Sequence, residues 1–250
     1  MGAELESVLD GTTLAAPAAA LDLRTDAHVH TGFAAGRDSV GVVVSTADRA
    51  GLTSLTFADQ VGPDTTWLSA YADAVRRARQ RTELTLRVAA EVEVVQPDGW
   101  LAWPADLGQL EAVSVAVSRL PLTAGPATPR EVRSLLAAGR LTPDEVAEVA
   151  VTATIKGIER ASRYAPAQLA RPLSLLAQVG IDDSAVTPAV LGALAAACRS
   201  TGTVVEISEA WRSPSPRVVA MLRGAGVAMV AASDARYAAE VGHWQYLRRV

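Results

Sequence analysis

The chain has 250 residues, 50% of them hydrophobic, and a formal net charge of −4. This length is enough for one well-buried core, and the small negative charge lacks the basic footprint of a protein that binds nucleic acid or an anionic membrane. No apolar run reaches the roughly 18 residues that a bilayer-spanning helix needs. Glu4 and Glu6 stand where a secretory leader would be basic, and Cys198 has no partner for an internal disulfide. We therefore expect a cytoplasmic protein without nucleic-acid or membrane partners.

Residues 1–20 end in an Ala/Pro-rich stretch and are predicted to be a lead-in, and residues 21–250 are predicted to form one domain. In that domain, short apolar runs of β type alternate with helical stretches. The predicted strands are Leu21–His28, Leu52–Ala58, Leu84–Val94, Ala112–Val117, Leu173–Ala177, Thr203–Ile207 and Val227–Ala232. The predicted helices are Val40–Ala50, Trp67–Arg81, Pro129–Ala138, Pro143–Tyr164, Pro188–Ser200 and Pro214–Arg223.

Several of these boundaries have a local signal. A hydroxyl residue precedes the first proline of three predicted helices, at Thr142, Thr187 and Ser213, and Asp64 or Thr65 precedes a fourth. Glycines stand where a helix gives way to a strand, as expected for a left-handed helix exit: Gly51, Gly180, Gly202 and Gly226.

Regular alternation of strands and helices indicates parallel strands joined by helical crossovers. A closed barrel and an open doubly wound sheet both satisfy this pattern. No Gly-x-Gly-x-x-Gly or Walker-type loop follows an early strand, which disfavours the nucleotide-binding form of the open sheet.

The segment Asp26-Ala27-His28-Val29-His30-Thr31 carries the clearest chemical signal. Side chains alternate along a strand, so Asp26, His28 and His30 share one face. Two imidazoles at the carboxyl end of a barrel strand can bind one cation where barrel active sites are built. The alternative is two histidines with ordinary hydrogen bonds. In a chain with three histidines, the pairing favours a metal site.

Carboxylates recur at the ends of later predicted strands, where Asp59 and Asp234 could also be helix caps. Glu91 and Glu93 share a face of the third strand, so one of them can bind metal while the other orients it. Two histidine nitrogens with two carboxylate oxygens make a shell suited to Zn²⁺, Mn²⁺ or Fe²⁺. The strand-end acids are Asp59, Glu91, Glu93, Glu206 and Asp234.

In this order, the His-x-His segment, Asp59-Gln60, Glu91-Val92-Glu93, Glu206-Ile207-Ser208 and Ser233-Asp234-Ala235-Arg236 resemble the PHP (polymerase and histidinol phosphatase) superfamily. The resemblance runs from about Leu21 to the C-terminus. It implies a distorted seven-stranded, TIM-like (β/α) barrel and a cluster of up to three metal ions, used mostly for hydrolysing phosphate esters.

The chain departs from this pattern at several metal-binding histidines. The resemblance implies histidines at or near the positions of Gln60, Ser118 or Arg119, Arg171 and Arg236. The set that it implies for one metal position is complete. The resemblance therefore implies that the protein binds at most one divalent metal ion. The alternative is that it binds none. The ligands implied for that ion are His28, His30, Glu91 and Asp234.

Arginine cannot ligate a cation, but it can replace the charge of one and bind a phosphate or carboxylate through two donors. The predicted anion-binding residues are accordingly Arg37, Arg119, Arg171 and Arg236. In the alternative interpretation, these arginines pair with unused carboxylates such as Asp59 or Glu93 and plug an inactive site. Trp211, after the sixth predicted strand, could wall a substrate pocket or simply pack under a loop.

The first functional hypothesis is a metal-dependent hydrolase that acts on a small anionic, phosphorylated substrate, with Asp59 or Glu93 as the general base. A non-catalytic PHP-like barrel that binds a ligand or partner is the alternative. An amidohydrolase-type barrel also begins with His-x-His, but it ordinarily needs further histidines and a bridging lysine, which the strand ends here lack.

Overall fold

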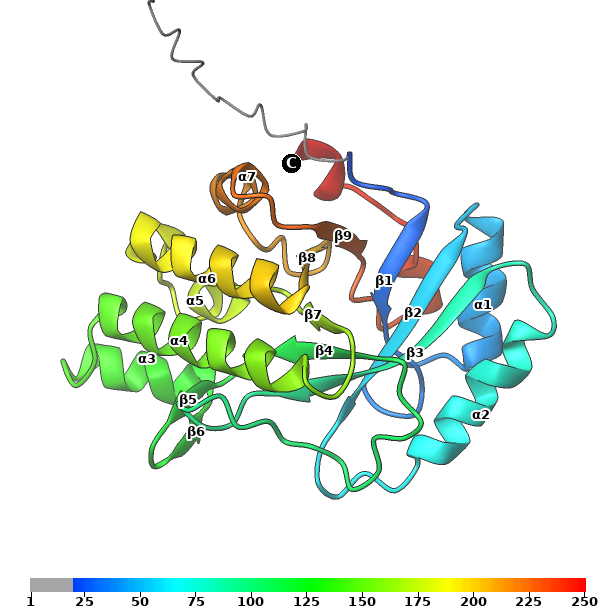
Figure 1. The fold of residues 1–250 in the computed structure, drawn as a ribbon, viewed down its shortest axis with the longest axis horizontal. Helices are drawn as coiled ribbons and strands as arrows, with labels where there is room; N and C mark the ends of the chain where they lie inside the picture. Colours follow the sequence, from blue (N-terminus) through cyan, green and yellow to red (C-terminus); the bar gives the residue numbers. More distant parts are fainter. Residues whose placement is uncertain (1–19) are drawn as a thin grey trace, which may run out of the picture.

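The computed structural model describes residues 20–250, so the predicted lead-in lies outside the described residues except for Ala20. Seven strands form one sheet in which every neighbouring pair is parallel, in the order β1-β2-β3-β4-β7-β8-β9 (Figure 1). The strands are β1 (Thr25–Val29), β2 (Ser54–Val61), β3 (Thr85–Glu93), β4 (Ala112–Ala116), β7 (Ala167–Leu169), β8 (Val204–Ser208) and β9 (Met229–Ala232).

The two edges of this sheet meet. The His30 amide donates to the Ala235 carbonyl and the Asp234 amide donates to the His28 carbonyl, each at 2.9 Å. These bonds join the end of β1 to the segment after β9. The sheet is therefore a nearly closed parallel barrel, as the resemblance predicted, and the alternative of an open sheet is wrong.

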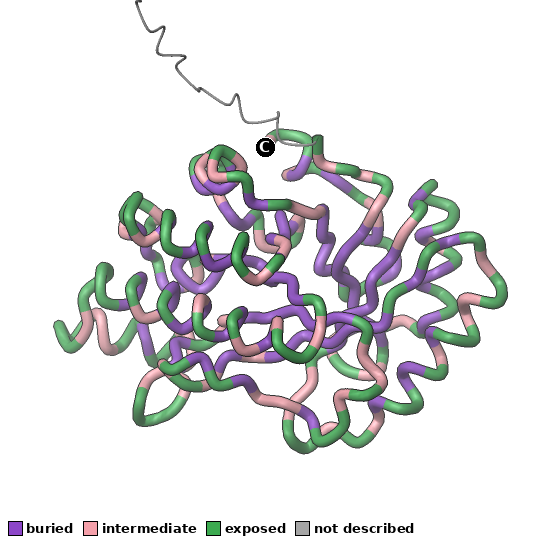
Figure 2. Tube along the Cα trace, in the orientation of Figure 1, coloured by how far each residue is buried: buried purple, intermediate pink, exposed green. Residues whose placement is uncertain are grey.

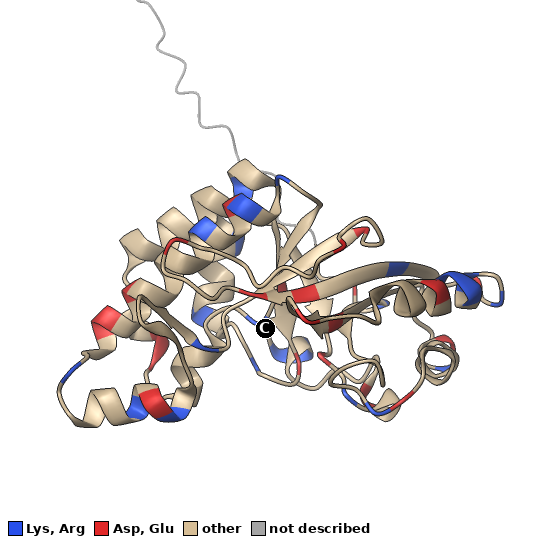
Figure 3. Cartoon of the chain, turned by 90° about the horizontal axis from the view of Figure 1, so that it is seen from below, with Lys and Arg blue, Asp and Glu red and all other residues tan. Residues whose placement is uncertain are grey.

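Helices cover the outside of the barrel, and the strands form the buried interior (Figures 1 and 2). Basic and acidic segments are interspersed over the outer helices (Figure 3). Among residues 20–250, no helix is both long and apolar enough to cross a membrane. The helices are α1 (Val40–Arg49), α2 (Leu68–Arg79), α3 (Pro129–Ala137), α4 (Pro143–Ala161), α5 (Ser174–Gln178), α6 (Pro188–Thr201) and α7 (Pro216–Gly224), with 3₁₀ turns η1 (Asp183–Ala185), η2 (Ala238–Glu240) and η3 (Leu247–Arg249).

The helix caps agree in part with the prediction. Thr142 forms a capping box with Glu145, and Thr187 caps α6. Helix α7 is capped by Ser215 instead of Ser213, and α2 begins without a side-chain cap. All four glycines predicted at helix exits have positive φ.

One predicted strand is wrong. Leu173–Ala177 belongs largely to helix α5, and the fifth barrel strand is β7 at Ala167–Leu169. A short apolar run has no periodicity that separates strand from helix, and β7 has only three residues. The prediction also missed the hairpin of β5 (Leu120–Leu122) and β6 (Gly125–Ala127) after β4.

The register of the sheet brings polar side chains into one row. Gln60, Glu91, Ser114 and Gln168 are successive register partners across β2, β3, β4 and β7. The preceding row consists of small side chains, Ala58, Ala89 and Ala112. Residues in one row across parallel strands project to the same side of the sheet. The polar row therefore lies next to the end of β1 that carries His28 and His30.

Candidate metal centre

Four side chains from three parts of the barrel converge at the carboxyl ends of its strands. One ligand-type atom from each of His28, His30, Glu91 and Asp234 lies within 4.8 Å of the others. The two histidines lie at the end of β1, Glu91 lies in β3, and Asp234 follows β9. All four are buried. They are the four residues that the sequence proposes as metal ligands, and a cluster of this composition could bind a metal ion.

His28 is oriented as a metal ligand would be. Its Nδ1 lies 2.8 Å from Glu206 Oε1, while its Nε2 faces Glu91 Oε2 at 3.2 Å without forming a hydrogen bond. A carboxylate at one ring nitrogen fixes the tautomer and leaves the lone pair of the other nitrogen available. A buried imidazole nitrogen without a hydrogen-bond partner is costly unless it has another ligand. His28 Nε2 therefore fits a metal ion.

His30 has the reverse arrangement, because its bonded nitrogen faces a proposed ligand and its nitrogen without a partner faces away from the other three. Its Nε2 lies 2.9 Å from Asp234 Oδ1 and 4.0 Å from Glu91 Oε2. Its Nδ1 has no hydrogen-bond partner and faces Asp59 Oδ1 at 3.7 Å. Asp59 is itself held by the amide of Thr31, at 2.8 Å, and by the Thr31 hydroxyl. Asp59 is fully buried behind His30. This position suits a residue that orients His30 better than a general base that contacts substrate.

Arg171 adds a buried positive charge to the cluster. Its Nη1 donates to Glu91 Oε2 at 2.7 Å and to Asp234 Oδ2 at 3.2 Å, and its Nη2 donates to Glu91 Oε1. The guanidinium lies over the ring of Trp211, 5.5 Å from the ring centroid. Arg171 therefore pairs with a carboxylate, as in one of the two interpretations of the sequence, but its partners are Glu91 and Asp234 and not Asp59 or Glu93.

The ionisable groups influence one another strongly. Burial by itself lowers the pKa of His28, but the carboxylates of Glu206 and Glu91 outweigh burial and hold this pKa well above its ordinary value. The pKa of His30 is raised in the same way, against burial, by Asp234 and Asp59.

The pKa values of the buried acids shift in two directions. Burial raises the pKa values of Glu91 and Asp234, but Arg171 and the nearby imidazoles outweigh it, so both values fall well below the usual range. Burial raises the pKa of Asp26 to about 6, in spite of its hydrogen bonds from Ser233.

The cluster buries more acidic than basic side chains. Within residues 20–250, the buried acidic and basic side chains are five carboxyl groups against one guanidinium and two imidazoles, namely Asp26, Asp59, Glu91, Glu206, Asp234, Arg171, His28 and His30. Five negative charges exceed the three positive charges that remain even when both imidazoles are protonated. Burying unbalanced charge is expensive. A divalent cation that displaces the two imidazole protons would leave this net charge unchanged and would take over the positive charge that the protonated rings supply.

Two residues outside the predicted set organise the cluster. Glu206 Oε1 accepts hydrogen bonds from His28 Nδ1 and Gln168 Nε2, and Glu206 Oε2 faces the Arg171 amide at 3.4 Å. Gln168 also donates to the Ala27 carbonyl at 2.7 Å and so connects β7 to β1. Glu206 carried a signal in the sequence as a strand-end acid. Gln168 carried none, because β7 was not recognised as a strand.

A small cavity lies beside the cluster. It has a volume of about 350 Å³ and is lined by Glu91, Glu93, Gln60, Ser118 and Arg119, with apolar residues around them. Glu93 accepts hydrogen bonds from the amide and hydroxyl of Ser118, at 2.6 and 2.8 Å, and burial raises its pKa. Arg119 is exposed at the rim. A substrate in this cavity would contact Glu93 and Arg119 and reach the cluster at Glu91.

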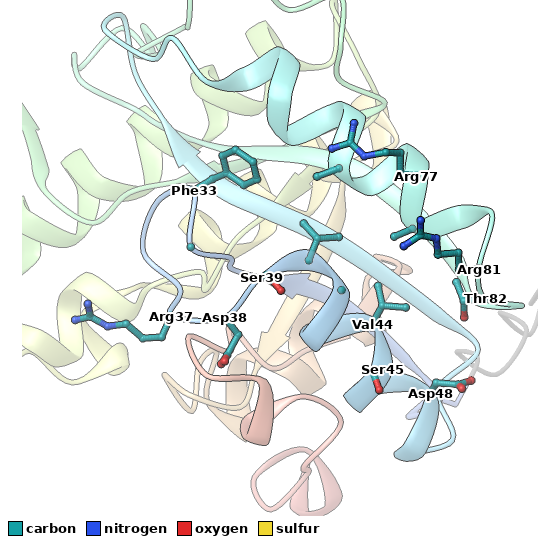
Figure 4. Close-up of a pocket in the computed structure, with 15 residues that line it drawn as sticks. Phe33, Arg37, Asp38, Ser39, Val44, Ser45, Asp48, Arg77, Arg81 and Thr82 are labelled. Atoms are coloured by element: carbon teal, nitrogen blue, oxygen red, sulfur yellow. The ribbon is translucent and has the colours of Figure 1, made fainter.

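Arg37 and Arg236 lie elsewhere. Both are exposed, and the Arg37 amide donates to the Arg236 carbonyl at 2.8 Å, with no described contact between either guanidinium and the cluster. Arg37 borders a groove of about 720 Å³ between α1 and α2. Figure 4 shows Arg77 and Arg81 projecting from α2 on one side of this groove and Arg37 extending away from them. Anion binding by Arg37 and Arg236 remains a prediction.

Gly36 keeps the loop after β1 close to His30, and we expect Gly36→Ala to weaken metal binding. A Cβ atom at this position would lie 2.6 Å from the carbonyl carbon of His30 and from the amide of Thr31. The backbone that carries His30 would have to move, with a loss of about 1–3 kcal/mol of stability. Gly32→Ala is the control, because its Cβ would meet only the Asp38 carbonyl, at 3.7 Å. Thermal unfolding and metal titration of both variants test this, and equal behaviour would contradict it.

Fold and cluster together define a class: a nearly closed parallel β/α barrel with a buried histidine–carboxylate cluster at the carboxyl ends of its strands. No protein-family model matches the sequence, and no curated protein matches it. Among solved structures, the chain is similar to the "putative histidinol phosphatase hisK from Listeria monocytogenes", with a TM-score of 0.69 and 12% identity over 88% of this chain and 97% of that one.

A second solved structure, a short-chain dehydrogenase from Oenococcus oeni, aligns at a TM-score of 0.31 with 12% identity, over 84% of this chain and 97% of that one. A score this low has no bearing on the fold. At 12% identity, the likeness to the first structure establishes the fold alone. The resemblance found in the sequence thus extends to the architecture of the barrel.

Proposed function

We propose that the protein is a metal-dependent hydrolase that acts on a small anionic substrate, most simply a phosphomonoester. The observation that carries this proposal is His28 Nε2, a buried nitrogen without a hydrogen-bond partner that faces Glu91 while Glu206 fixes the opposite side of the ring. The residues that would hold the ion are His28, His30, Glu91 and Asp234. A bound divalent ion supplies Lewis-acid polarisation of the phosphoryl group and a water of lowered pKa.

The residues around the ion then have distinct roles. Glu206 is hydrogen-bonded to His28 Nδ1 and Asp59 faces His30 Nδ1 at 3.7 Å, so these two carboxylates would orient the rings that hold the ion. Glu93 lines the adjacent cavity, and its raised pKa suits a carboxyl group that exchanges a proton with water or with the leaving oxygen of the substrate. Arg119, which lines the rim of the same cavity, would bind a substrate anion. The volume of the cavity favours a small substrate.

A metal titration tests this proposal. Mn²⁺ or Zn²⁺ at about 100 times its dissociation constant is expected to stabilise the folded state by about 2.7 kcal/mol, or about 5–10 °C in Tm for a chain of this size. His28→Ala should lose this shift, whereas His243→Ala should keep it because the exposed His243 lies outside the cluster. Hydrolysis of p-nitrophenyl phosphate should follow the same pattern. Wild-type protein that ignores both metals would overturn the proposal.

One observation favours a second candidate, a non-catalytic barrel that binds a ligand. Arg171 already pairs with Glu91 and Asp234, two of the four residues that would hold the ion. If this pairing replaces metal altogether, neither metal should change the Tm of the wild-type protein. The same titration therefore separates the two candidates.

A further inference from the structure

Glu91 and Asp234 each face two different cation positions. Asp234 turns Oδ1 toward His30 Nε2, at 2.9 Å, and Oδ2 toward Arg171 Nη1, at 3.2 Å. Glu91 directs Oε2 toward His28 Nε2, at 3.2 Å, and also accepts from Arg171 with both oxygens. In hydrolases with two metal ions, bridging carboxylates face two cations that lie about 3.5–4 Å apart. Here one of the two positions adjoins the imidazoles and the other contains a guanidinium.

The guanidinium is fixed in its position. Arg171 is 3% exposed, and Glu91 binds it through two parallel hydrogen bonds. The guanidinium also lies over the ring of Trp211, with the ring centroid 5.5 Å from the guanidinium carbon. These contacts hold the Arg171 side chain within the cluster.

The backbone around Arg171 also adopts a conformation specific to this position. Arg171 has a φ of 34° and Leu173 a φ of 64°, both in the left-handed region that residues with side chains avoid. Conformations of this kind are strained and persist where the surrounding structure requires them. The Ser213 hydroxyl binds the carbonyl of the intervening Pro172, and Glu206 Oε2 lies 3.4 Å from the Arg171 amide. Helix α5 begins at Ser174 immediately afterwards.

We infer that Arg171 is a built-in cation that occupies the second cation position between Glu91 and Asp234 and limits the site to one metal ion. This inference rests on the proposed function and specifies how that site differs from one with two metals. A guanidinium stays protonated and has no lone pair, so it supplies one positive charge but cannot ligate a metal or activate a water. Arg171 is thus a positioning residue that balances the two carboxylates, and metal chemistry is confined to the side of the imidazoles.

Metal stoichiometry tests the inference. Protein treated with a chelator and then dialysed against Mn²⁺ is expected to bind one ion per chain by elemental analysis. Arg171→His removes the fixed charge and supplies an imidazole, so binding should rise to two ions per chain. Arg171→Lys keeps the charge and should stay at one. Arg236→His, the same replacement at an exposed position, should also stay at one.

A second measurement keeps the test decisive if Arg171→His does not fold. Wild-type protein saturated with Mn²⁺ should give the electron paramagnetic resonance signal of an isolated ion, and not that of an exchange-coupled pair. Two ions in the wild type would overturn the inference and leave the proposed function standing. So would one ion in a folded Arg171→His variant. No ion in the wild type would overturn the proposed function itself, and the inference with it.

Discussion

Arg171→Met is expected to destabilise the metal-free protein by about 3–5 kcal/mol. Removing one partner of a buried ion pair leaves the other charge without compensation, and here one guanidinium serves two carboxylates, Glu91 and Asp234. Their side chains are 2% and 0% exposed, so water cannot replace the lost partner. Urea unfolding at neutral pH in the presence of a chelator measures the effect.

Arg160→Met is a close control. Arg160 pairs with Asp98 at 2.8 Å and lies over Trp100 at 5.6 Å, which matches the surroundings of Arg171 in chemistry. The Arg160 and Asp98 side chains are 34% and 54% exposed, however, and exposed pairs contribute about 0–1 kcal/mol. If both variants lose the same small amount, Arg171 does not neutralise the cluster. If added metal partly restores the stability of Arg171→Met, the ion and the guanidinium neutralise the same two carboxylates.

Metal affinity is expected to depend steeply on pH. The pKa values of His28 and His30 are raised by the surrounding carboxylates, so an incoming ion must displace protons from both rings. Each displaced proton changes the apparent association constant by about tenfold per pH unit, or about 100-fold for two. Titrations with Mn²⁺ at about pH 5.5 and about pH 6.5 measure this dependence. A change of less than about tenfold would contradict the displacement of two protons.

Metal affinity is expected to rise with pH, whereas the stability of the metal-free protein should fall as the pH rises near neutral. Groups with a raised folded-state pKa stabilise the fold below their unfolded pKa, and this contribution is lost as the pH rises through the folded value. The stabilising contribution of His28 and His30 is therefore lost as the pH rises from about 6.5 through their raised folded pKa values, and that of Asp26 is lost between 3.8 and about 6.

The lowered pKa values of Glu91 and Asp234 act on the acidic side, because their contribution is lost as the pH falls below 4.5 and 3.8. We therefore expect maximal stability of the metal-free protein at mildly acidic pH. The metal-saturated protein should instead gain stability as the pH rises from there. Thermal unfolding with and without metal across this range tests the expectation, and parallel curves would contradict it. His243→Ala should behave as the wild type, because His243 lies outside the cluster.

Much of the local structure could be predicted from residue patterns. Alternation of side chains in a strand places Asp26, His28 and His30 on one face, whatever the strand later packs against. The capping signal at Thr142 and the glycines at helix exits act within a few residues, so they carry over directly to the fold. The prediction failed at β7, where three residues are too few to show a period.

The tertiary structure decided which distant residues complete the site. Four arginines were equivalent candidates in the sequence, and only barrel closure and strand register bring Arg171 between Glu91 and Asp234 while Arg37 and Arg236 stay exposed. Gln168 and Glu206 gain their roles in the same way, because a hydrogen bond from β7 to β1 exists only in a closed barrel. The sequence alone was enough to predict which ionisable side chains lie at the strand ends, because this prediction depends only on short-range periodicity. The balance of charge among these side chains depends on contacts between residues that are 63 to 204 positions apart, which no local pattern encodes.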